Sequence, residues 1–380
     1  LVNGVKIPSP DNKNRFVPLD IFPSEMLDRL EVTKSLTANM EGDGIGGAVN
    51  LIMKDAPSER QFTANLSTGY NAMYFGRDFQ SFNRGGIVKK SPYEALGKPE
   101  DYKVTMEDFT TSNLRMKWKK PLPDLTAGLS YGDRFFDDKL GVMLAGSFLS
   151  TSRGKESRLY YQPGTSHNGI EYRNYSSEKT RIGVHAKLDY SLNDNHKLTW
   201  YNGYMDMSEA EVRDGEDEKE RAVRMRWNHQ YIINSTLKGE HLFLSGGALR
   251  LNWSAVLSKA FSETPDNAEI YLLGSHVSTT DAAKRRWEHN SDKDKAGYVD
   301  LVYKLKLDGG AILDFSAGGM YRDKKRDSFF NEYTFNSATG SKNPQYINKD
   351  WFNFDEIQFV PRPYGNIGDP LNYDATEKIG

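Results

Sequence analysis

Apolar and polar residues alternate with a period of two along most of this chain. In residues 180–190, for example, Ile182, Val184, Ala186, Leu188 and Tyr190 alternate with polar, charged or small residues. This pattern is typical of a β-strand between two different surroundings, because successive side chains point to opposite faces. Nine segments show it and are predicted to be strands: 61–72, 125–135, 141–150, 180–190, 196–206, 222–234, 248–258, 297–306 and 311–321. Helical periodicity is scarce, with one short candidate at 23–30.

The predicted strands are about ten residues long, and their connections alternate between long and short. Ten tilted residues match the hydrocarbon thickness of a membrane, whereas soluble strands usually have about five or six. We expect long connections at 73–124, 151–178, 208–220, 262–295 and after residue 322, short ones at 136–140, 191–195 and 307–310, and an intermediate one at 237–247. Outer-membrane β-barrels have this asymmetry. A soluble β-sheet protein also alternates apolar and polar residues, so it remains an alternative.

Composition excludes several classes of protein. There are no cysteines, so disulfides, thiolate metal sites and cysteine nucleophiles are excluded. Lysine and arginine number 50 against 52 acidic residues, a balance that gives no general attraction to nucleic acid. The mean hydropathy is −0.69, and no apolar run is long enough for a membrane-spanning helix. An apolar fraction of 37% with 21 Tyr, 19 Phe and 33 Gly favours a barrel with a polar lining and aromatic girdles.

Short motifs that often carry chemistry lack their required context here. Residues 42–47 match the G-x-G-x-x-G pattern, but a strand rather than a helix is predicted after them, so a glycine-rich turn is the better interpretation. Residues 128–132 match G-x-S-x-G, yet the alternation continues on both sides, which argues against a catalytic Ser130. The acidic stretch 211–220 lacks calcium-loop spacing. We therefore expect no catalytic residue, no metal site and no cofactor.

One segment carries a specific resemblance. Residues 29–54 read RLEVTKSLTANMEGDGIGGAVNLIMK, and the pattern predicts a strand near 30–34, a glycine-rich turn and a second strand at 48–53. This resembles the second half of the plug domain of TonB-dependent outer-membrane receptors. The matching positions are Glu31, Val32, Lys34, Gly42, Gly46, Gly47, Val49 and Asn50. Ser35 departs from the glycine that many members have, so that turn is expected to differ locally.

The resemblance implies a plug domain lodged inside a transmembrane antiparallel β-barrel of 22 strands. Residues 1–57 would be the C-terminal part of the plug, and residues 58–380 would form the first part of the barrel, with about nine strands. The chain begins with Leu1 rather than Met, and we interpret it as an internal piece of a longer protein. The signal peptide, the TonB-binding segment and the remaining strands would lie outside it.

The resemblance also implies a function and partners. The protein would be a receptor in the bacterial outer membrane that actively imports a scarce iron chelate, oligosaccharide or peptide and catalyses no reaction. TonB and the inner-membrane energising complex would be its partners, together with the imported ligand and outer-membrane lipid, and a surface lipoprotein is a further candidate. A passive porin, a soluble β-sheet ligand-binding protein and a signalling receptor remain alternatives.

Candidate site residues fall into three groups. By analogy with related receptors, Lys34, with Glu31 nearby, would form a latch between plug and barrel. The glycine turn comprises Gly42, Gly44, Gly46 and Gly47. For ligand contact the candidates are the aromatic residues of two predicted loops, because aromatic rings stack on sugars, peptides and iron chelates alike: Tyr160, Tyr161, Tyr172, Tyr175, Trp351, Phe352 and Phe354. Polar residues such as Arg181, Lys187, Arg224 and Arg226 are expected to face the plug or water.

Overall fold

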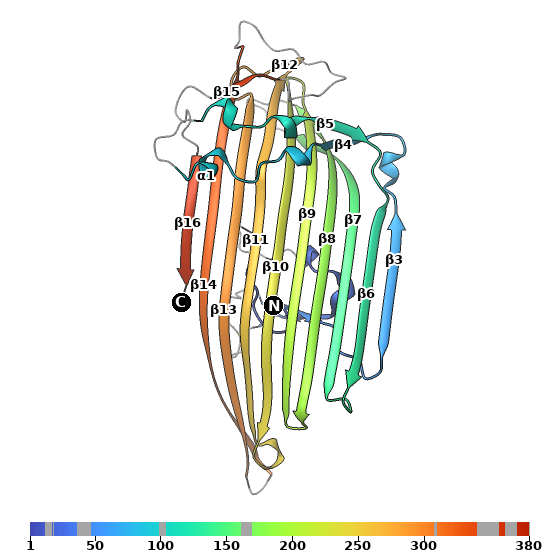
Figure 1. The fold of residues 1–380 in the computed structure, drawn as a ribbon, viewed down its shortest axis with the longest axis vertical. Helices are drawn as coiled ribbons and strands as arrows, with labels where there is room; N and C mark the ends of the chain where they lie inside the picture. Colours follow the sequence, from blue (N-terminus) through green and yellow to red (C-terminus); the bar gives the residue numbers. More distant parts are fainter. Residues whose placement is uncertain are drawn as a thin grey trace.

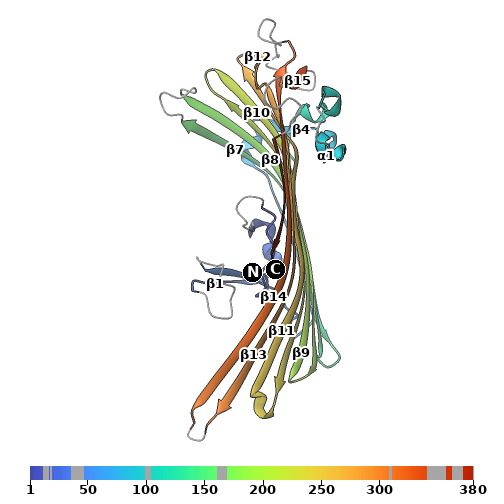
Figure 2. The same ribbon diagram turned by 90° about the vertical axis from the view of Figure 1, so that its left-hand side faces the viewer.

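A large, curved antiparallel sheet forms most of the computed structural model (Figures 1 and 2). The structure describes residues 1–11, 17, 19–35, 47–98, 104–160, 169–307, 310–339, 357–361 and 371–379. Within these residues the sheet has 12 strands, in the order β15-β14-β13-β11-β10-β9-β8-β7-β6-β3, with β12 paired to β11 and β16 paired to β14. Neighbours in the sheet are largely neighbours in sequence, which is an up-and-down arrangement.

The strands of the sheet are β3 (Gln61–Gly69), β6 (Asp124–Phe135), β7 (Leu140–Tyr160), β8 (Ile170–Asn193), β9 (His196–Glu216), β10 (Glu220–Phe243), β11 (Leu249–Leu273), β12 (His276–Val277), β13 (Ala283–Lys306), β14 (Ile312–Ser337), β15 (Phe359–Pro361) and β16 (Leu371–Ile379). Two two-stranded sheets lie outside it, the hairpin of β1 (Leu27–Thr33) with β2 (Ala48–Met53) and the pair of β4 (Phe79–Phe82) with β5 (Met116–Lys119). The helices are short: α1 (Pro92–Ala95) and the 3-10 turns η1 (Leu19–Ile21), η2 (Ser24–Met26), η3 (Ala72–Tyr74), η4 (Arg84–Gly86), η5 (Met106–Asp108), η6 (Ser112–Leu114) and η7 (Ser245–Gly247).

The nine predicted strands are all present, and the predicted all-antiparallel β fold is confirmed. Their predicted lengths were wrong, because β7 to β11, β13 and β14 run for 21 to 26 residues instead of about ten. The segments 151–178, 208–220 and 262–295 and the first residues after 322 are therefore largely strand, where long connections were expected. The strands stay paired by hydrogen bonds beyond the region in which one face is exposed and apolar. The alternation of apolar and polar residues marks only that region, so it predicts strands that are too short.

Four connections agree with the expectation, one long and three short, because only residues 194–195 separate β8 from β9 and only residues 307–311 separate β13 from β14. The segment between β3 and β6 is long and contains β4, β5 and α1. The turn between β6 and β7 is tight, and Phe136, Asp137 and Asp138 have positive φ values of 56°, 54° and 63° there. The division of the chain into domains at residue 57 stays a prediction.

The two faces of the sheet have different coverings. Residues opposite each other in neighbouring antiparallel strands lie on the same face, so the pairings Tyr204↔Ile233 and Leu237↔Ala255 extend one face across β9, β10 and β11. This is the convex face, and large apolar side chains are exposed on it from β3 to β14: Phe62, Leu66, Leu129, Leu144, Ile182, Val184, Trp200, Tyr204, Ile233, Leu237, Leu257, Val299, Leu301, Leu313, Phe315 and Tyr321. We call this set the apolar band.

The N-terminal residues lie on the opposite, concave face. Figure 2 shows β1 and the N-terminus on the inner side of the curved sheet, with α1 and β4 beyond its outer side at the upper end. The concave face carries buried residues such as Met143, Met205 and Ile232, which pack against the N-terminal residues. The segment from β4 to β5 covers the upper part of the convex face, above the apolar band.

A bulge in β11 separates these two parts of the convex face. The register shifts between Thr264 and Asn267 against β13, and between Met225 and His229 against β10, so β11 has one extra residue there. Pro265 and Asp266 occupy the bulge, and Asp266 has φ +50°. Leu257 below the bulge and Ile270 above it consequently share the convex face despite their opposite parity.

An arginine in the apolar band tests what this face contacts. Leu129 in β6 is 58% exposed, and Leu122, just before β6, is 78% exposed. If lipid covers the band, Leu129→Arg should destabilise the folded protein by about 2–4 kcal/mol, whereas Leu122→Arg should cost about 0–1 kcal/mol because it lies at the edge of the band. Urea titration of the protein refolded into lipid vesicles measures both values. Equal, near-zero costs would indicate that water covers Leu129.

Candidate functional site

The N-terminal residues form a small core against the concave face of the sheet. Ile21, Met26 and Met53 are fully buried there, and they pack against Met143 and Met205 of the large sheet. We call this 12-stranded sheet the wall. The β1–β2 hairpin supplies Met53, and the turns η1 and η2 supply Ile21 and Met26. Apolar burial therefore fixes the described N-terminal residues to the wall, and this interface is the candidate functional site.

Charged side chains of the wall surround this core and hold the N-terminal residues. Lys179 Nζ lies 2.9 Å from Asp20 Oδ2, and Lys187 pairs with Asp55. Arg181 donates a hydrogen bond of 2.7 Å to the Asp20 carbonyl oxygen. Arg181 and Lys187 were expected to face the plug or water, and both contact the N-terminal residues.

Arg224 and Arg226 do not contact the N-terminal residues that the structure describes. Arg224 Nη2 lies 2.7 Å from Glu211 Oε1, and Arg226 Nη2 lies 3.5 Å from the same oxygen. The shared carboxylate belongs to β9, so these two arginines tie neighbouring wall strands together.

A second set of polar contacts joins residues 9–11 to β13 and β14. The Ser9 amide lies 3.4 Å from Asp292 Oδ2, and Asn290 Nδ2 donates a hydrogen bond of 3.3 Å to the Pro10 carbonyl oxygen. Asp292 is completely buried and also lies 3.0 Å from Lys324 Nζ. Leaving a buried polar group without its hydrogen-bond partner is costly, so these contacts fix the position of Ser9 and Pro10 on the wall.

A glycine in β8 makes the close approach of the N-terminal residues possible. A Cβ atom on Gly183 would lie 2.4 Å from Pro23 Cγ and 2.7 Å from Met26 Sδ. Distances this short do not occur between real atoms, so any other residue at 183 must push η2 away from the wall. Gly146, which pairs with Val184 on the convex face, has no such neighbour, because the nearest atom to its Cβ would be 3.9 Å away.

The predicted latch residues lie in and next to β1. Glu31 accepts hydrogen bonds from Arg29 Nε at 2.9 Å and from Asn50 Nδ2 at 3.1 Å, both within the β1–β2 hairpin. Arg29 Nη1 also donates a hydrogen bond of 2.8 Å to Asp28 Oδ2. The hydrogen bonds to Asp28 and Glu31 raise the pKa of the Arg29 guanidinium. Lys34 is exposed and forms no ion pair with the residues that the structure describes. The latch role stays a prediction.

Of the four glycines predicted for the turn, Gly47 is described and Gly42, Gly44 and Gly46 lie outside the described residues. Gly47 has φ +108°, and a Cβ there would lie 2.4 Å from the Thr33 carbonyl oxygen. Glycine is therefore required where β2 begins opposite Thr33.

The aromatic candidates fall partly on strands rather than on one loop. Tyr160 ends β7, and Tyr172 and Tyr175 lie in β8. Tyr172 and Tyr175 have opposite parity in that strand and so face opposite sides of the sheet. Arg158 lies over the Tyr172 ring and Lys155 over the Tyr175 ring, at 5.4 Å and 5.5 Å. Tyr161, Trp351, Phe352 and Phe354 lie outside the described residues.

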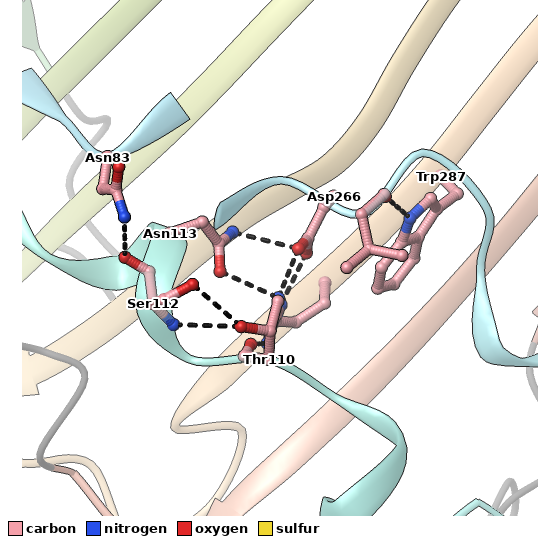
Figure 3. Close-up of polar contacts among 8 residues, drawn as sticks. Asn83, Thr110, Ser112, Asn113, Asp266 and Trp287 are labelled. Carbon is pink, nitrogen blue, oxygen red and sulfur yellow. Dashed lines mark hydrogen bonds and ion pairs between the residues drawn. The ribbon is translucent and has the colours of Figure 1, made fainter. Parts of the chain in front are cut away.

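A buried polar cluster fixes the segment between β3 and β6 to the upper wall (Figure 3). Arg285 of β13 donates to Asp266 Oδ1 at 2.6 Å, to the Thr110 carbonyl oxygen at 2.6 Å and to Asn113 Oδ1 at 3.1 Å. Asn113 in turn donates to Asp266 Oδ2 at 3.0 Å. Complete burial raises the pKa of the Asp266 carboxyl, and the Arg285 and Asn113 contacts oppose that rise.

An aromatic residue completes this attachment. Trp287 is buried two residues along β13 and donates a hydrogen bond of 2.9 Å to the Val88 carbonyl oxygen. Its ring packs edge to face against Tyr333, and Phe109 also packs against both rings. The segment is therefore held by both polar and apolar contacts.

The sequence prediction missed this cluster. Its members lie in two separate parts of the sequence, 73–124 and 262–295, and both were interpreted as long connections. One signal was available, because Pro265-Asp266-Asn267 interrupts an alternating stretch, and proline within a strand pattern indicates a bulge or an edge strand.

Among the residues that the structure describes, no group of three or more His, Asp or Glu side chains is arranged to bind a metal ion. No helix in this part of the chain is both long and apolar enough to cross a bilayer.

Comparisons with known proteins give distant structural similarity only. No protein-family model matches the chain, and no curated protein matches it significantly. Solved structures that resemble it include the ferric citrate transporter FecA in the unliganded form, the ferric preacinetobactin receptor BauA from Acinetobacter baumannii and the RagAB peptide importer in a closed-closed state. Identities are 12%, 12% and 10%, with TM-scores of 0.33, 0.27 and 0.30.

The matches cover 91%, 95% and 92% of this chain and 54%, 59% and 56% of those chains. The chain thus spans a little over half the length of the three structures. Similarity this distant assigns no ligand, partner or residue role to the chain.

Replacing Gly183 should displace the N-terminal residues. We expect Gly183→Val to destabilise their packing by about 1–3 kcal/mol, because the new side chain overlaps Pro23 and Met26. Hydrogen–deuterium exchange should then quicken in β1 and β2 but stay slow in β9 and β10. Gly146→Val is the matched control on the convex face and should leave exchange in β1 and β2 unchanged. Equal exchange in both variants would contradict the close approach.

Removing Arg285 should release the segment that covers the upper wall. Arg285→Ala leaves Asp266 buried without its ion-pair partner, which should cost about 3–5 kcal/mol. Limited proteolysis should then cleave within residues 104–119. Arg286→Ala is the control, because Arg286 lies on the other face, is partly exposed and pairs with Glu332. Resistance of the Arg285→Ala variant to cleavage would show that the cluster does not hold the segment.

Proposed function

We propose that this chain forms part of an outer-membrane importer of the TonB-dependent type. Its long strands would be a section of the barrel wall, and its N-terminal residues would be part of a plug that closes the lumen. No bond of the imported ligand is broken in such a protein, so binding and movement of the plug account for the activity.

The observation that carries the proposal is the difference between the two faces of the wall. Exposed apolar residues extend over the convex face of nine strands, from β3 to β14, with Leu66 77% exposed and Leu257 60% exposed. An apolar surface this large is unfavourable in water, and it suits the hydrocarbon core of a bilayer. The opposite face carries charged residues and the packed N-terminal segment, as the lumen of a plugged barrel would.

The edges of the sheet support closure into a barrel. Among the described residues β3 pairs with β6 and has no partner on its other side. An unpaired strand edge is not tolerated in hydrocarbon, because no water is present to satisfy its backbone groups. Further strands would therefore pair with β3 and complete the wall.

The motif at residues 29–54 supports the plug assignment. The strand, glycine turn and strand predicted there correspond to β1 and β2, with Gly47 at the start of β2. TonB and its energising complex would then be partners on the periplasmic side. The ligand would be an iron chelate, an oligosaccharide or a peptide, and the described residues do not choose among them.

Conductance in a planar lipid bilayer tests the proposal against a passive porin. The gene product purified from outer membranes should insert without a steady ionic current, because the N-terminal residues fill the lumen. Deletion of residues 1–57 should open a steady current while the strands keep their heat-dependent electrophoretic mobility. A steady current from the intact protein would favour the porin, and failure of the protein to enter bilayers would contradict the barrel.

Energy dependence tests the import step separately. The periplasmic part of TonB, produced as a separate fragment, should co-purify with the intact gene product. Cells that produce the protein should take up labelled ferric chelates, maltodextrins or peptides, and this uptake should fall to background when the proton gradient across the inner membrane is collapsed. Uptake that continues without the gradient would contradict active import.

A further inference from the structure

Lysines from three neighbouring strands stand in one row on the convex face of the wall. Lys259 of β11 pairs with Lys293 of β13, and Lys293 pairs with Lys325 of β14. Neighbouring strands are about 5 Å apart, and directly opposite residues lie on the same face. Lys295 lies two residues from Lys293 on the same face.

The row lies at the upper edge of the apolar band. Leu257 is exposed two residues before Lys259 along β11, and Phe261 follows two residues after it. Lys259 Nζ donates a hydrogen bond of 2.7 Å to the Tyr231 hydroxyl and lies over the Tyr231 and Phe261 rings. Tyrosine and other amphipathic aromatic residues are enriched at the level of lipid headgroups. The lysines therefore stand where an apolar surface ends.

The acidic residues nearby neutralise the row only in part. Lys325 Nζ lies 3.3 Å from Asp327 Oδ1, and both side chains are largely exposed. Asp323 stands opposite Lys295 in the register. Lys293 and Lys295 are exposed and form no ion pair with any residue in the described part of the chain. Like charges directly opposite each other destabilise a sheet, so the row has a cost that an anionic partner would remove.

We propose that this row binds the phosphate groups of phosphorylated lipid in the outer leaflet of the membrane. The inference rests on the proposed function, because it requires that lipid covers the convex face. A lipid suits the site better than a soluble anion does, since its chains would lie along Leu257 and the neighbouring apolar band while its phosphate reaches the lysines. The upper position agrees with an outer leaflet, because the short β6–β7 and β8–β9 turns are at the opposite end of the strands (Figure 1).

Binding of a phosphorylated glycolipid to the purified gene product tests the site. The probes are lipid A carrying its phosphates, the same lipid after enzymatic removal of its phosphates, and inorganic phosphate. Each lysine near an anionic lipid surface contributes a factor of about five in affinity, so the double variant Lys293→Gln, Lys325→Gln should bind phosphorylated lipid A about 25-fold more weakly than the wild type. Native mass spectrometry in detergent measures the bound lipid.

The control variant is Lys304→Gln, Lys306→Gln, which removes two exposed lysines from the concave side of the lower part of β13. It should bind phosphorylated lipid A as the wild type does, and all three proteins should bind the dephosphorylated lipid equally weakly. Equal binding by both double variants would overturn the inference, as would preference for inorganic phosphate over the lipid.

The same experiment separates the inference from the proposed function. If the wild type inserts in membranes and the row has no effect on lipid binding, the lipid site fails and the importer proposal stands. If the wild type does not insert in membranes at all, the proposed function fails and the lipid site fails with it.

Discussion

Large apolar side chains exposed along one face of nine strands limit where this protein can reside. Burial of apolar area stabilises a protein only if something covers that area, and the described residues leave Leu66, Leu129 and Phe315 uncovered. The chain covers the upper part of the same face with its own segment between β3 and β6. The band below is left for another apolar medium, and a bilayer fits its height of about ten residues per strand.

This constraint reverses the usual arrangement of a β protein. In a soluble sheet the apolar face is the inside and the polar face meets water. Here the concave face combines charged residues such as Lys187 and Arg181 with a small apolar core around Met26 and Met205. Glycine at 183 lets η2 come within contact of the wall. The N-terminal residues are thereby held by a close steric fit and by ion pairs to exposed partners.

The bulge at Pro265 and Asp266 links the two ways in which the convex face is covered. One extra residue in β11 places Ile270 on the same face as Leu257, so that β11 contributes to the apolar band below the bulge and to the covered core above it. Asp266 uses its positive φ to reach Arg285 and Asn113. A local irregularity thus fixes a segment whose residue Asn113 lies 153 positions earlier in the chain.

The sequence predicted the part of the fold that depends on a single repeating signal. Strands such as 180–190 were found because their two faces have different surroundings, and alternation records that difference directly. The upper halves of the same strands were interpreted as connections, because residues such as Glu211 and Arg213 place charges on one face and mask the alternation. The bulge at 265 also changes the parity, which a strict period of two does not follow.

The candidate site was predictable only where a local motif marked it. The β1–β2 hairpin and Gly47 were expected from residues 29–54, and the contacts of Arg181 and Lys187 were expected from their polar face. The cluster of Asn113, Asp266 and Arg285 joins distant parts of the chain, and no local pattern indicates such a contact. Tyr172 and Tyr175 were grouped as one loop, whereas the extension of β8 places them on opposite faces.

Contact of the convex face with lipid is the central claim, and a spin label measures it directly. The chain has no cysteine, so Leu257→Cys and Ile232→Cys each introduce one labelling site, exposed on the convex face and buried on the concave face respectively. In the protein reconstituted in lipid vesicles, a nitroxide at 257 should collide often with oxygen and rarely with a water-soluble nickel chelate, whereas one at 232 should show low accessibility to both. Ready access of the nickel chelate to the label at 257 would show that water covers this face and would contradict the account.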